Sequence, residues 1–125
     1  VARYADEWNA VYLSITELKA RNELLDQLLA DQGRQPGEVR RSLMTGCVFA
    51  HDQAGLDQAV QQRTQGRLTA AELRQRGLVV GTAPQVAEQL KAIEASGVPR
   101  VMLQWLDLDD IAGLEALAKG VLAQL

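Results

Sequence analysis

Three short segments of the sequence are rich in apolar residues, and longer segments with apolar residues at helical spacing lie between them. The three segments span residues 7–13, 42–50 and 100–106. In the third, Gln104 is the one polar residue of an apolar run that follows Arg100. A short apolar run between two amphipathic helices is typical of a parallel strand that is buried on both faces. The alternation therefore predicts an α/β fold in which right-handed crossovers join parallel strands.

Polar residues mark where the intervening helices begin. Residues 14–17, 69–72 and 82–85 each match a capping box, in which Ser or Thr and a Glu or Gln three residues later satisfy free backbone N–H groups. A fourth helix is predicted over residues 52–63, and a fifth begins near residue 109 and carries a wide apolar stripe. The pattern leaves the type of the short apolar segment at residues 78–81 open.

The predicted sheet is small for an independent domain. Three strands bury little apolar area, and both edges of such a sheet are unpaired. The chain opens Val-Ala-Arg-Tyr-Ala without an initiator Met, and residues 1–5 are typical of the last turn of a helix. We therefore expect residues 1–125 to form one partial domain that belongs to a larger sheet.

Composition narrows the classes of function. The net charge of −3 offers no basic surface for nucleic acid, and no apolar run approaches the ~20 residues of a membrane span. The single cysteine, Cys47, excludes an internal disulfide and a multi-cysteine metal site, and favours a reducing cytoplasm. Glycine-rich nucleotide loops, the Walker loop, the G-x-S-x-G elbow and the H-E-x-x-H motif are all absent from the sequence.

Four segments resemble, in order and spacing, parts of the luciferase-like monooxygenases. Residues 2–9, Ala-Arg-Tyr-Ala-Asp-Glu-Trp-Asn, resemble the segment that follows the family's glycine-rich phosphate loop. Residues 33–37 with Arg41-Ser42 resemble a helix-to-strand turn of the family. Residues 81–86 resemble the start of its penultimate helix, and residues 97–103 resemble its final strand.

The resemblance implies a fold and an activity. Members of this family are (β/α)₈ TIM barrels that use FMN or the deazaflavin coenzyme F-420 to oxidise small organic substrates, some with molecular oxygen. A complete barrel needs about 250 residues, so this chain would supply the C-terminal three βα units. The glycine-rich loop would lie before Val1. The resemblance therefore implies a C-terminal fragment of an oxidoreductase or monooxygenase, which is inactive and binds no cofactor when isolated.

Four residues at the predicted carboxyl ends of strands are candidate cofactor contacts, because barrel enzymes bind ligands at those ends. Asn9 could hydrogen-bond a cofactor ring or phosphate, or it could be a loop residue that bonds its own backbone. Trp8 and Trp105 could wall an isoalloxazine ring, or they could be core aromatic residues. Gln104 ends the final strand and is the remaining candidate.

Other polar residues have a structural interpretation beside each functional one. His51 could act as a general acid or base after the second strand, or it could be an exposed residue at a helix entry. Three aspartates at 107–110 could hold a divalent cation, but acids are also favoured at a helix N-terminus, and we predict no metal. Cys47 is expected to be a buried, neutral thiol, and Arg40-Arg41 a solvated pair before a strand. Gly46 is expected to allow a bulge or a close backbone approach.

Three functions remain open at this stage. The first is the oxidoreductase fragment, whose small-molecule substrate would be bound by the complete barrel. The second is a non-catalytic α/β module that forms a homo-oligomer through its strand edges and apolar helix faces. The third is a small, unrelated α/β binding domain. The sequence leaves open the choice of cofactor, the substrate, the use of oxygen and the oligomeric state.

Overall fold

The computed structural model describes residues 1–125, which form four strands, five α-helices and one short 3₁₀ helix. In chain order these are β1 (Glu7–Val11), α1 (Ile15–Asp31), η1 (Pro36–Glu38), β2 (Arg40–Phe49), α2 (Gln53–Thr64), α3 (Ala70–Gln75), β3 (Val79–Gly81), α4 (Ala83–Ala95), β4 (Arg100–Gln104) and α5 (Ile111–Leu122). No helix is long and apolar enough to cross a bilayer.

All strands are parallel, and β2 is the partner of each of the others. Strand β1 pairs with residues 40–44 and β4 with residues 42–46, while the short β3 pairs with residues 47–49. The predicted α/β fold with parallel strands and crossover helices is confirmed. The segment at residues 78–81, whose type the sequence left open, contains strand β3.

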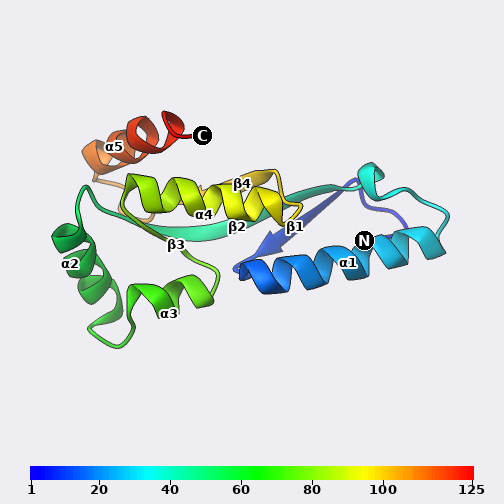
Figure 1. The fold of residues 1–125 in the computed structure, drawn as a ribbon, viewed down its shortest axis with the longest axis horizontal. Helices are drawn as coiled ribbons and strands as arrows, with labels where there is room; N and C mark the ends of the chain where they lie inside the picture. Colours follow the sequence, from blue (N-terminus) through cyan, green and yellow to red (C-terminus); the bar gives the residue numbers. More distant parts are fainter.

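Helices α1, α4 and α5 cover one face of the sheet. Helices α1 and α4 lie along this face (Figure 1), and their buried side chains join those of α5 and the strands in the main core. This core consists of Ala10, Leu18, Leu43, Cys47, Val79, Val86, Ala87, Ile93, Val98, Leu117 and Val121. A second cluster packs α2 and α3 against the other face of the sheet, at the carboxyl half of β2 and at β3, through Val48, Leu56, Val60, Leu73 and Val80.

The rest of this second face, which we call the open face, carries alternate residues of three strands. They are Glu7, Asn9 and Val11 of β1, Ser42, Met44 and Gly46 of β2, and Arg100, Met102 and Gln104 of β4. Val11 and Met102 remain 47% and 41% exposed. The prediction that residues 100–106 form a strand buried on both faces is therefore wrong: β4 ends at Gln104, and Met102 on its second face stays exposed.

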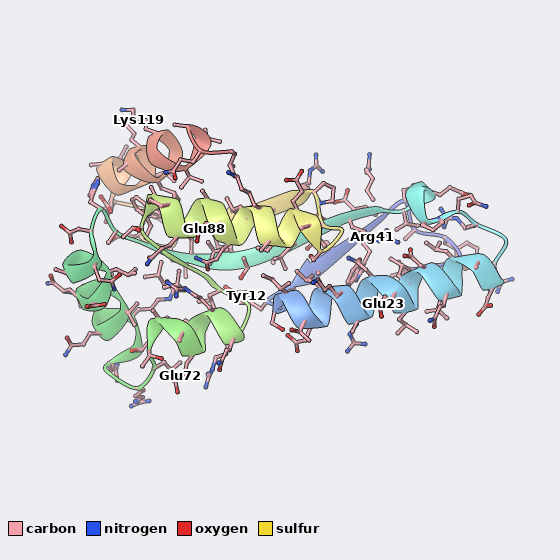
Figure 2. The ribbon with its side chains drawn as sticks, viewed as in Figure 1. Tyr12, Glu23, Arg41, Glu72, Glu88 and Lys119 are labelled. Atoms are coloured by element: carbon pink, nitrogen blue, oxygen red, sulfur yellow. The ribbon has the colours of Figure 1, made fainter.

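Two boundaries also differ from the sequence prediction. Strand β2 begins at Arg40, so the two arginines lie inside the strand and not before it. Arg41 points toward α1 and pairs with Asp26, and its side chain is only 14% exposed. The prediction of a solvated pair thus holds for Arg40, which is 72% exposed, and is wrong for Arg41 (Figure 2).

Candidate functional site

The carboxyl ends of β1 and β4 flank residues 44–46 of β2, toward the end of the sheet where parallel α/β folds bind ligands. Tyr12 directly follows β1, and its hydroxyl donates a hydrogen bond of 2.5 Å to Oε1 of Gln104 at the end of β4. These strands lie on opposite sides of β2, so the tyrosine side chain crosses β2. It crosses at Gly46, where a Cβ atom would lie 3.2 Å from Tyr12 Oη.

The backbone of Tyr12 has an unusual conformation. Its φ is +51°, in the left-handed region that residues other than glycine adopt infrequently. A bulky residue there costs about 1–3 kcal/mol, which the surrounding contacts must offset. Figure 2 shows Tyr12 where β1 gives way to α1, close to the end of α3. The strain accompanies a specific placement of the phenol ring over the strand ends.

Two further groups complete the cluster around Gly46. The Gln104 amide donates to Met44 Sδ at 3.6 Å, which holds its carbonyl oxygen toward Tyr12. Arg63, in the last turn of α2, brings Nη2 to 3.3 Å from the position of a Cβ on Gly46. Arg63 forms no ion pair within the chain. The cluster therefore combines a phenol, an amide and an unpaired guanidinium at one edge of the sheet.

A second polar network lies on the open face, nearer the amino end of β2. Asn9 donates to Ser42 Oγ at 2.9 Å, and Ser42 donates to Glu7 Oε1 at 2.7 Å. This hydrogen bond from Ser42, followed by the charges of Arg100 and Arg40, lowers the pKa of Glu7. The carboxylate is therefore ionised at neutral pH. The alternative of a loop Asn that bonds its own backbone is wrong, because Asn9 belongs to β1 and bonds another strand.

The structure separates the four predicted cofactor contacts into two groups. Asn9 and Gln104 share the open face. Trp8 points the other way, toward the helices, and packs against the main core and a small cluster of Leu25 and Leu29 of α1 with Val39. Trp105 also packs against the main core, and its indole Nε1 is buried without a hydrogen-bond partner. A ligand on the open face would contact Asn9 and Gln104 but not Trp8.

A cavity of about 410 Å³ adjoins the cluster beyond the end of β2. Its walls include Trp105, Arg63 and Asp110, together with Cys47 from the helix-covered side of β2. Asp110 Oδ1 accepts from the Gly113 backbone N–H at 2.8 Å and thereby caps α5, as the structural interpretation of the aspartates predicts. The chain contains no group of three His, Cys, Asp or Glu side chains arranged for a metal ion.

His51 and Cys47 lie near the end of β2 without polar partners suited to catalysis. The His51 ring meets Phe49 edge-on, with centroids 5.9 Å apart, and the residue is exposed at the entry to α2. Burial raises the pKa of the Cys47 thiol to about 11, although the charge of Arg63 opposes this shift. The thiol therefore stays protonated at neutral pH and acts as a small apolar side chain.

Solved structures share this fold over nearly the whole chain. A coenzyme F-420-dependent tetrahydromethanopterin reductase from Methanopyrus kandleri matches 98% of it with a TM-score of 0.71 and 10% identity. An EDTA monooxygenase from Chelativorans sp. BNC1 matches 98% with a TM-score of 0.73 and 14% identity. A long-chain alkane monooxygenase matches 99% with a TM-score of 0.71 and 13% identity.

The match covers only part of these proteins: 46%, 42% and 37% of their respective chains. This chain thus has the fold of less than half of each TIM-barrel neighbour, and the predicted resemblance to luciferase-like enzymes is confirmed for the fold. No family model matches the sequence, and no curated protein matches it.

Proposed function

We propose that this chain forms the C-terminal part of a luciferase-like oxidoreductase that uses FMN or coenzyme F-420 to act on a small organic substrate. The observation that supports this most is the fold match over 98–99% of the chain to a coenzyme F-420-dependent reductase and to two monooxygenases. The order of the four resembling segments along the sequence supports it independently.

The polar groups on the open face suit a flavin or deazaflavin ring, whose edge carries several hydrogen-bonding atoms. Asn9 Oδ1 makes no hydrogen bond within the chain and is free to accept one. Gln104 and Tyr12 lie on the same face, at the carboxyl ends of their strands. The cofactor would supply hydride transfer or oxygen activation, while these residues would bind and orient its ring.

The chain alone lacks an enclosed site for this chemistry. Val11 and Met102 on its open face are 47% and 41% exposed, and water also reaches Asn9 and Tyr12. Hydride transfer and oxygen activation need a site from which water is excluded. We therefore expect activity and cofactor binding only where the remaining strands of the barrel cover this face.

An absorbance spectrum of the natural chain at its full encoded length tests this proposal. After addition of FMN or coenzyme F-420 and removal of the excess, the protein should retain a flavin-like or deazaflavin-like band, and the band position identifies the cofactor. Residues 1–125 expressed alone serve as the control and should retain none. A full-length protein that retains neither cofactor contradicts the proposal.

The second candidate function is self-association, and a groove of about 590 Å³ beside β4 favours it. The groove lies between α4, α5 and β4, and apolar side chains such as Leu90, Val101 and Leu114 line most of it. Strand β4 pairs only with β2, so its other edge is free to pair with a second copy of the chain. Sedimentation at micromolar concentration should then show a dimer, and a clean monomer counts against this function.

We also propose a cytoplasmic location for the protein. Cys47 is a free, buried cysteine and no disulfide is possible within the chain. Free thiols persist in reducing compartments, of which the cytoplasm is the commonest. Reaction of the unfolded protein from cell extracts with a thiol reagent tests whether Cys47 is reduced in the cell.

A further inference from the structure

Arg63 carries a charge that the fold of this chain does not use. Its guanidinium forms no salt bridge, and none of the hydrogen bonds of the chain involves it. A cation in the last turn of α2 interacts favourably with the helix dipole, which accounts for an arginine at this position. The dipole does not account for the direction of the side chain, which reaches over Gly46 of another element.

Gly46 makes this approach possible. A Cβ atom there would lie 3.3 Å from Arg63 Nη2 and 3.2 Å from Tyr12 Oη, closer than most side-chain contacts. The missing side chain therefore leaves room for both groups in the carboxyl half of β2. Tyr12 is held in this space by its hydrogen bond to Gln104, and the guanidinium approaches the same glycine.

The carboxylates near Arg63 do not neutralise it by contact. Asp107 and Asp110 line the adjoining cavity, but neither lies within salt-bridge distance of the guanidinium. Asp110 already accepts the backbone N–H of Gly113 at the start of α5. The N–H donors of Arg63 thus remain available to a ligand at the edge of the cavity.

We propose that Arg63 binds the anionic oxygens of the substrate, which would therefore be an organic acid with a carboxylate or a similar oxyanion group. A guanidinium presents several N–H donors in one plane and matches such groups better than any other side chain. The site lies at the carboxyl ends of the strands, next to the residues assigned to the cofactor ring. The nature of the ligand rests on the proposed function, whereas the position of the site rests on the geometry of Arg63, Tyr12 and Gly46.

Citrate titration of the full-length natural chain, followed by NMR of the Gly46 amide and the Arg63 Nε–H, tests this site. Citrate should shift both signals. Arg63→Gln should weaken citrate binding about 10- to 100-fold, as expected for loss of a hydrogen bond to a charged group. Arg63→Lys should retain part of the affinity. Arg67→Gln, an exposed arginine of the following loop, is the matched control and should bind like the native chain.

A second arm compares FMN with riboflavin, which lacks the phosphate. If Arg63→Gln weakens binding of FMN but not of riboflavin or citrate, Arg63 binds the cofactor phosphate and the assignment to the substrate is overturned. If Arg63→Gln and Arg67→Gln behave alike with every probe while flavin is bound, the site is refuted and the proposed function stands. If citrate binding depends on Arg63 while no flavin or deazaflavin binds, the site stands and the proposed function fails.

Discussion

Gly77 shows how much of the candidate site depends on single backbone positions. It has a φ of +82° and lies against the backbone of Tyr12 and Leu13, where a Cβ atom would come within 2.7 Å of two carbonyl carbons. Thr45 of β2 donates to its carbonyl oxygen at 2.6 Å. Gly77 therefore joins the approach to β3 to the turn that holds Tyr12 over the strand ends.

Gly77→Ala should destabilise the protein by about 3 kcal/mol, because the methyl group adds a clash with fixed backbone to the strain of a positive φ. Gly33→Ala is the matched control, since Gly33 also has a positive φ (+70°) but nothing within 4 Å of its Cβ position. It should cost about 1 kcal/mol. Urea unfolding measures both values, and equal losses would contradict the proposed contact.

Sequence reasoning at this scale found the residues that belong to strands and missed those that a turn or a helix delivers. Asn9 and Gln104 could be assigned to strands, where side chains alternate, and Gln104 ends β4 as predicted. The prediction that Asn9 lies at a carboxyl end is wrong, because it is the central residue of β1. Tyr12 could not be placed from the sequence, because its position depends on a left-handed backbone conformation that no sequence motif predicts. Arg63 could not either, since its reach depends on how α2 packs against β2. The one sequence feature that pointed to this cluster was Gly46, a glycine inside an apolar strand.

At the scale of elements, the starts of the helices followed the sequence closely. Ser14 accepts the N–H of Glu17, and the Glu17 carboxylate accepts the Ser14 N–H at 2.8 Å, as the capping box predicts. Thr69 and Glu72 repeat this arrangement at α3. Strand β3 escaped prediction because three residues are too few for periodicity, and β2 began early because nothing in the sequence separates Arg40 from the turn before it.

Ser14→Ala should destabilise α1 by about 1 kcal/mol at neutral pH, because it removes the cap of the helix. It should also weaken the pH dependence of stability. Hydrogen bonds from the Ser14 side chain and backbone hold the pKa of Glu17 below its ordinary value of 4.5. The folded state therefore favours the ionised carboxylate, and this contribution is present above pH 4.5 and lost as the pH falls through the lowered pKa.

Unfolding midpoints between pH 7 and pH 3 measure this effect. The native chain should lose more stability over this range than Ser14→Ala does. Thr16→Ala is the control, since Thr16 is exposed in the same turn and makes no side-chain hydrogen bond there. An identical pH dependence in all three proteins would show that the capping carboxylate contributes nothing measurable.

At the scale of the whole molecule, the second face of β1 and β4 is largely exposed. The sequence predicted parallel strands correctly, but it could not show which face of β4 the helices leave open, because an apolar run has no preferred side. The helix-facing Val101 and Leu103 pack against the core, whereas Met102 between them is exposed. The expectation of a larger sheet agrees with this asymmetry.

Two equally exposed apolar residues distinguish the surfaces through which copies of the chain could associate. Leu114 in the groove and Met102 on the open face are both 41% exposed. If a second copy binds the groove, Leu114→Glu should raise the dimer dissociation constant at least about tenfold, since a buried unpaired charge is costly. Met102→Glu should leave it unchanged. Sedimentation velocity of both variants measures the dissociation constants. A weakened dimer in Met102→Glu but not in Leu114→Glu would assign the interface to the open face.

Strand β2 has a consequence that reaches beyond any one site. Strands β1, β3 and β4 share no ladder with one another, and each is aligned only by its hydrogen bonds to residues 40–49. Loss of order in β2 would therefore remove the hydrogen-bonding partner of all three other strands at once. The chain should accordingly gain or lose its structure as a single cooperative unit, with no subset of strands able to persist alone.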